Sequence, residues 1–213
     1  MKSLNLLSLA SLTLLVGCKV ADAPGGGTAA GPATTEAVVA SPTATLAMEA
    51  DVATAGDGRS LCAAEESVVF SCTLSGTKHF ASLCASRSVG DQTGYVYFAQ
   101  GPSGHAGYVF PSDKSAPAGR FKRSHLGFGG GSGGFAYSFE DAGRKHIVYS
   151  ISGEQGLEDQ GVIVAANDAA KADSALACEK GSVIESEDDA LFKYTMSWPK
   201  DEAIESKGLP AKN

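Results

Sequence analysis

The sequence predicts a mainly β domain, an antiparallel sandwich or barrel held by two disulfides and ending in one short C-terminal helix. Short β-branched and aromatic runs recur about every ten residues from residue 58 onward, which is typical of antiparallel sheets. The segments between them are rich in Gly, Pro, Asn and Ser, which favour turns. Long amphipathic helices do not alternate with these runs, which argues against a parallel α/β sheet.

Residues 1–17 have the composition of an export signal. Lys2 supplies a positive charge, an apolar run extends over residues 4–16, and a small residue precedes Cys18. The run is too short for a membrane span, which needs about 20 apolar residues. The string at 15–18 (LVGC) resembles a bacterial lipoprotein signal, which implies cleavage before a lipidated and acylated cysteine. We therefore expect Cys18 to be the lipidation site; an ordinary secretory signal with an incidental cysteine is the alternative.

The resemblance also implies where the protein is anchored. Lys19 stands where an aspartate would favour retention in the inner membrane. The implied location is the outer membrane, with the domain facing the periplasm or, alternatively, the cell surface. The membrane is then a partner through the N-terminal lipid.

Residues 18–57 are expected to be a disordered tether that begins with the lipidated cysteine. They contain no aromatic residue and are dominated by Ala, Thr, Gly, Pro and Val. Such a stretch cannot bury enough apolar surface to offset its ordering entropy. A transient helix at 45–54 is the weaker alternative.

Residues 58–213 form the expected disulfide-containing β domain. This part carries 15 basic and 19 acidic residues, so its net charge is −4. A mildly acidic domain gives no reason to expect nucleic acid or an anionic lipid surface as a partner. The one dense basic stretch, residues 120–123 (RFKR), is interpreted as a solvated strand or loop.

Nine runs have the composition of strands, and residues 95–98 (YVYF) and 147–149 (IVY) have the strongest strand character. The expected strands comprise residues 68–74, 79–86, 94–99, 107–110, 119–128, 133–140, 146–151, 162–166 and 175–178. The alanines between 162 and 177 are also compatible with a helix. Because Asn167 and Asp168 lie between two apolar runs, a hairpin turn is favoured there.

Four cysteines in this part form an even set, which predicts two disulfides in an exported protein. They are Cys62, Cys72, Cys84 and Cys178. No pair of them has the two-to-four-residue spacing of a zinc knuckle.

The register of the first predicted hairpin limits the possible disulfide pairings. If Leu74 lies opposite His79, then Cys72 and Cys84 project from opposite faces of the hairpin, which argues against a bond between them. Two pairings remain open: Cys62–Cys72 with Cys84–Cys178, or Cys62–Cys84 with Cys72–Cys178. Either one joins a late strand to the first hairpin.

One helix is expected near the C-terminus, over residues 187–195. Ser186 is a suitable N-cap, and acidic residues occupy positions 187–189 in the first turn. An N-cap hydroxyl accepts a hydrogen bond from a free backbone N–H, and carboxylates interact favourably with the positive end of the helix dipole.

Several short strings resemble a family of uncharacterised exported proteobacterial proteins. They are residues 69–72 (VFSC), 82–86 (SLCAS), 136–139 (AYSF) and 147–150 (IVYS), with a Tyr-rich strand and a Gly-rich run between them. The similarity covers about residues 60–180 and implies export and a β fold, but no activity. Members often carry Arg-Phe-Gly after the Tyr-rich strand, where this chain has FAQG.

Residues 130–134 (GGSGG) match the pattern of a nucleophile elbow, with Ser132 as the candidate nucleophile. His146 and Asp141 complete a conceivable triad, and His125 is a second histidine near the glycine run. An elbow needs a helix after the turn, whereas a strand is predicted here. In the serine stretch of chymotrypsin-like proteases, which the string faintly resembles, an aspartate stands in place of Gly131. We therefore expect no catalytic residue, and interpret the run as a hairpin loop, a bulge or a flexible binding loop.

No metal or cofactor is expected. Glu154, Glu158 and Asp159 lie in a glycine-rich segment and are conceivable calcium ligands or a carboxylate pair. Their spacing matches no calcium loop, and solvated acidic residues are the simpler interpretation.

Two classes of function remain. The first is an outer-membrane-anchored lipoprotein with a non-catalytic domain that binds an envelope protein, a glycan or a small molecule, or has a structural role. The second is a secreted serine hydrolase centred on Ser132. We expect the first class, because the sequence contains no coherent set of nucleophile, base and oxyanion donors.

Overall fold

The computed structural model describes residues 58–115, 119–167 and 169–212. The expectations for Cys18 and the tether lie outside these residues. Within them the chain forms strands β1 (Glu66–Thr73), β2 (His79–Ser86), β3 (Val96–Pro102), β4 (Tyr108–Phe110), β5 (Lys122–Phe128), β6 (Ser132–Asp141), β7 (Arg144–Gly153), β8 (Leu157–Ala166), β9 (Ser174–Ala177) and β10 (Ile184–Glu185). The helical elements are η1 (Glu154–Gly156), α1 (Asp189–Met196) and α2 (Glu202–Lys207).

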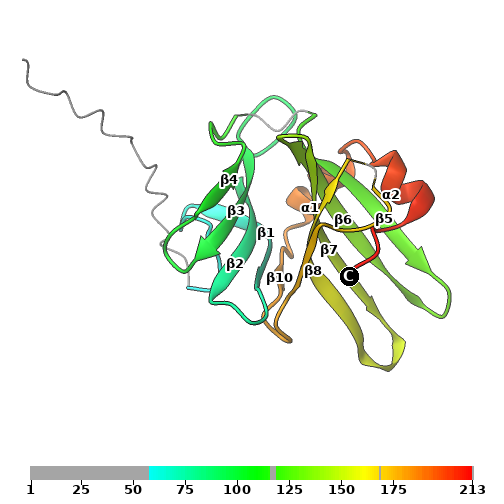
Figure 1. Cartoon of the computed structure of the whole chain (residues 1–213). Helices are drawn as coiled ribbons and strands as arrows, with labels where there is room; N and C mark the ends of the chain where they lie inside the picture. The colour runs from blue at the N-terminus through cyan, green and yellow to red at the C-terminus, as the bar shows by residue number, and fades with distance from the viewer. Residues whose placement is uncertain (1–57, 116–118, 168, 213) are drawn as a thin grey trace, which may run out of the picture. The chain divides into compact units, whose positions relative to one another are not determined.

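The strands form two five-stranded antiparallel sheets, which confirms the predicted mainly β class and its sandwich form (Figure 1). The first sheet has the order β10-β1-β2-β3-β4, and the second has the order β5-β6-β7-β8-β9. Their facing sides share one core. At its centre the ring of Phe139 in β6 lies 5.3 Å from that of Phe98 in β3 and 4.4 Å from that of Phe110 in β4.

The nine predicted strands correspond to β1–β9; β2 has the predicted bounds, and the ends of the others are shifted. The predicted hairpin after residue 162 is confirmed, because β8 pairs antiparallel with β9 and Val162 lies opposite Leu176. β8 begins five residues earlier than predicted, at Leu157, since its start pairs with the end of β7. β10 was not predicted, because two residues give no pattern of alternation.

The predicted C-terminal helix is present as α1, but its N-cap was predicted wrongly. The carboxylate of Asp188, and not the hydroxyl of Ser186, accepts from the N–H groups of Ala190 and Leu191. Ser186 Oγ instead accepts from the N–H of Asp188, because Ser186 lies two residues before the N-cap position. The shorter helix α2 was missed. None of the described helices is long and apolar enough to cross a membrane.

Each sheet is buried on both faces. The outer face of the first sheet is covered by the segment before β1, where Leu61 packs with Tyr97 of β3. The outer face of the second sheet is covered by α2 and the C-terminal segment, where Ile204 packs with Ile147 of β7. This explains why the Tyr-rich strand is apolar without alternation, since both of its faces are enclosed.

A β-bulge in β1 shifts the register of its pairing with β2 by one residue. Phe70 lies opposite Leu83 and Val68 lies opposite Cys84, so that Val69 is the extra residue between them. The bulge directs both Val69 and Phe70 into the core between the sheets. A register in which Leu74 lies opposite His79 would, without a bulge, continue to Val69 opposite Cys84; the bulge shifts the partner of Cys84 by one residue, to Val68.

The disulfides are Cys62–Cys84 and Cys72–Cys178, with S–S distances of 2.03 and 2.09 Å. This is one of the two pairings that the register left open. Cys72 lies opposite Ala81 and faces the core between the sheets, whereas Cys84 faces the outer layer. The first disulfide holds the covering segment before β1. The second holds the point where the chain passes from the second sheet to the first, since Cys178 donates to Gln160 of β8 and bridges Leu74.

We predict that removing the second disulfide costs more stability than removing the first. The sequence separations are 106 and 22 residues, for which the chain-entropy model gives about 5 and about 3 kcal/mol. Urea unfolding of Cys72→Ala/Cys178→Ala and of Cys62→Ala/Cys84→Ala measures the two losses. Equal losses would show that chain entropy does not decide the difference.

Candidate binding recesses

The residues of the conceivable triad do not come together. Ser132 is the first residue of β6 and Asp141 is the last, while His146 pairs with Phe139 near the Asp141 end. Phe139 follows Ser132 by seven positions along the extended strand, a distance of about 23 Å at 3.3 Å per residue. The hydroxyl of Ser132 donates to the carbonyl of Gly129 in its own loop, at 3.3 Å.

His146 is a packing residue between aromatic rings. Its imidazole stacks 5.2 Å from the ring of Tyr108 and 4.9 Å from that of Phe139. The hydroxyl of Tyr108 donates to Asp141 at 2.8 Å. Burial lowers the pKa of His146, and the neighbouring Asp141 only partly opposes this. The imidazole is therefore kept neutral and takes part in the contact between the sheets.

The first two residues of the glycine run lie in the hairpin loop between β5 and β6, as its interpretation as a loop requires, whereas Ser132, Gly133 and Gly134 already belong to β6. Gly130 and Gly131 have φ angles of +78° and +71°, a conformation that side chains other than glycine rarely adopt. His125 lies opposite Phe135 in β6, and its backbone N–H donates to Glu205. The run therefore meets the needs of a tight turn.

The acidic residues in and after the β7–β8 connection, Glu154, Glu158 and Asp159, do not converge on one site. Glu154 belongs to η1, whereas Glu158 and Asp159 are neighbours in β8 and so point to opposite faces. Asp159 forms an ion pair with Lys212 at 2.6 Å and accepts from Tyr149 at 3.0 Å. In the described part of the chain, no group of three or more His, Cys, Asp and Glu residues is arranged to hold a metal ion.

A buried ionic network beneath α2 was missed by the sequence analysis. Asp201 is 2% exposed, and its carboxylate accepts from Lys145 of β7 at 2.9 Å and from Ser138 of β6 at 2.8 Å. The same carboxylate caps α2 by accepting from the N–H groups of Ala203 and Ile204. Burial raises the pKa of Asp201, but the bonds from Lys145 and Ser138 outweigh it and keep the pKa below its usual value. One side chain therefore starts the helix and fixes it to the sheet.

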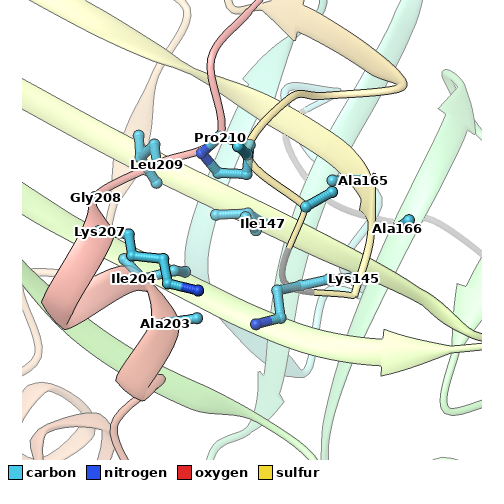
Figure 2. Close-up of a pocket in the computed structure, with 12 residues that line it drawn as sticks. Lys145, Ile147, Ala165, Ala166, Ala203, Ile204, Lys207, Gly208, Leu209 and Pro210 are labelled. Carbon is cyan, nitrogen blue, oxygen red and sulfur yellow. The ribbon is translucent and has the colours of Figure 1, made fainter.

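A first recess, here called the tail recess, lies between this helix and the second sheet (Figure 2). It has a volume of about 100 Å³ and its walls are mostly alanine and aliphatic. Ile147 and Ala165 line it from the strands, and Ile204 and Leu209 from the covering segment. A mostly apolar space of this size admits an apolar group of a few carbon atoms. Figure 2 shows the ends of the Lys145 and Lys207 side chains on one side of it.

A second recess, here called the Arg123 recess, opens where the two sheets meet α1. Its volume is about 170 Å³. Strands β1, β5, β6 and β10, the segment that leads into α1, and α1 itself line it. The lining residues are Val69, Arg123, Phe135, Tyr137, Glu185, Ser186, Leu191, Phe192 and Thr195. Elements from the whole length of the domain therefore build it, and the bulge residue Val69 forms part of its floor.

Arg123 is the one basic side chain that lines this recess. Its guanidinium carbon lies 5.3 Å from the ring centre of Phe135, 5.8 Å from that of Tyr137 and 5.3 Å from that of Phe192. From the sequence alone, Arg123 was expected to lie in a solvated basic stretch, residues 120–123. The signal for its position was alternation, because Phe121 and Arg123 are two residues apart and share the inward face.

Comparison with known proteins adds no assignment. No family model, no curated protein and no solved structure matches the chain.

We predict that Asp201→Ala destabilises the domain by about 3–5 kcal/mol, since it leaves the buried Lys145 without this carboxylate and removes the cap of α2. Asp201→Asn, which keeps a capping acceptor, and Lys145→Met should each also be destabilising. The double variant Asp201→Asn/Lys145→Met removes both charges, so its loss should be smaller than the sum of these two single losses. Urea unfolding of the wild type, the two single variants and the double variant measures this, and strictly additive losses would contradict the coupling.

Proposed function

We propose that the protein is a lipoprotein anchored to the outer membrane through Cys18, and that its β domain binds an envelope component without catalysis. The ligand classes that this allows are an envelope protein, a glycan or a small molecule, and no cofactor takes part.

The disulfides support export. All four cysteines of the described residues are paired, two of them across 106 residues. Such cross-links persist in oxidising compartments such as the bacterial periplasm, and they are rare in the reducing cytosol. The string LVGC before residue 19 supports a lipid anchor, as does the absence of aromatic side chains from the following segment, residues 19–57.

The observation that carries the binding proposal is the Arg123 recess. It presents a cation among aromatic rings, next to two apolar side chains that are about half exposed, Phe192 at 51% and Met196 at 54%. Large apolar side chains that gather around one polar group are typical of recognition sites. The hydrolase alternative gains no support, because Ser132 and His146 lie far apart along the strands.

The anchor is tested by labelling the full chain with a palmitate analogue in a Gram-negative host. We expect label on the wild-type chain, none on Cys18→Ala, and outer-membrane density for the labelled protein on a gradient. Cys62→Ala/Cys84→Ala is the matched control, because it removes two cysteines and keeps Cys18. Label that persists in Cys18→Ala would contradict the proposed anchor.

Binding is tested by immobilising the full chain and passing over it an envelope extract that includes peptidoglycan fragments. We expect a component that wild type and Arg120→Gln retain, and that Arg123→Gln loses by tenfold or more. Arg120 belongs to the same basic stretch but does not line the recess, so it controls for charge alone. Equal retention by the two variants would contradict a role for the recess.

A further inference from the structure

The Arg123 side chain lacks the partner that a partly buried guanidinium normally has. None of the described carboxylates lies within ion-pair distance of it, and its Nε is shielded from solvent without a hydrogen-bond partner. Its Nη1 contacts the sulfur of Met196, which is a weak acceptor. Buried cations are almost always paired, because desolvation without compensation is costly. The guanidinium therefore has unused capacity for an anion.

We propose that the Arg123 recess binds the carboxylate of an apolar amino-acid residue, supplied as a free amino acid or as the C-terminal residue of a peptide. This inference rests on the proposed binding function and names the ligand chemistry of the same site. The planar fork of Arg123 matches a carboxylate in two parallel hydrogen bonds.

The walls select an apolar side chain next to that carboxylate. Phe135, Leu191 and Phe192 face the recess, and its volume of about 170 Å³ is close to that of a cavity that holds a benzene ring. One side chain the size of leucine or phenylalanine fits this space. Its burial also covers Phe192, which is otherwise half exposed.

Glu185 extends the recognition to the amino side of the ligand. It lines the same recess from β10 and forms no ion pair with the described residues. A carboxylate there accepts from an α-ammonium group or from a peptide N–H, and it repels ligands with several negative charges. The carboxylate of Glu185 therefore makes the recess selective for an amino-acid residue over phosphate or sulfate, which Arg123 alone would also attract.

The test is calorimetric titration of the full chain in non-ionic detergent with its disulfides intact. The probes are free leucine and phenylalanine, and a pentapeptide that ends in leucine as the acid and as the amide. We expect binding of the free amino acids or of the peptide acid, and binding of the peptide amide at least tenfold weaker than the acid. Saturation by the free amino acids identifies the small molecule as the source, and saturation by the peptide acid alone identifies a chain end.

Four variants locate the site. Arg123→Gln should weaken binding tenfold or more, and Arg123→Lys should weaken it less, because the charge remains and the fork is lost. Arg120→Gln should leave binding unchanged. Phe192→Ala changes an exposed side chain and should weaken binding with thermal unfolding unaltered, so that its result stands even if Arg123→Gln unfolds.

Three results would overturn the proposal. The first is equal binding of the peptide acid and the peptide amide, and the second is equal binding by Arg120→Gln and Arg123→Gln. The third is no binding of any probe at a concentration of about 10 mM. In the last case, Arg123-dependent retention from envelope extract would keep the binding function and reject only this ligand chemistry. Loss of both would reject the function of the recess as well.

Discussion

Apolar side chains on both faces of each sheet are the constraint on which the rest of this structure depends. Two sheets packed together bury only their facing sides, around Phe139 and Phe98. The outer sides, which carry Tyr97 in the first sheet and Ile147 in the second, then need cover of their own. The segment before β1 and the segment after α1 supply it. The segments before β1 and after α1 therefore contribute to the hydrophobic core, each on the outer face of one sheet.

Each covering segment is held by one strong local attachment. The Cys62–Cys84 disulfide fixes the first segment, and the ion pair between Asp201 and Lys145 fixes the second. Glu66, at the start of β1, has a role like that of Asp201, because its buried carboxylate accepts from Tyr97 at 2.6 Å and from Lys114 at 3.0 Å. Burial raises the pKa of Glu66, and these hydrogen bonds together bring it below its usual value. Both carboxylates are thus kept charged inside apolar layers.

The Arg123 recess results from the same architecture. Where β10 has only two residues, the first sheet ends early, and α1 covers the gap between the sheets without filling it. The bulge at Val69 turns an apolar side chain to the floor of this gap. Arg123 enters it from β5, on the inward face that it shares with Phe121. The recess therefore lies where regular strand pairing stops.

Local patterns were sufficient to predict β1–β9, the hairpin at residues 162–177 and the opposite orientation of Cys72 and Cys84, because alternation and turn composition act over a few residues. They left two disulfide pairings open, since the choice depends on where Cys178 returns to β1. They also placed Arg123 in solvent and overlooked Asp201. The start of α2 carried a local signal, an aspartate before Glu202 and a glycine after Lys207, but the partners of that aspartate lie 56 and 63 residues away in sequence. The sequence by itself determined most of the strands and the first C-terminal helix; only the tertiary structure decided which charges are buried together and where the Arg123 guanidinium lies among aromatic rings, because these are contacts between distant segments.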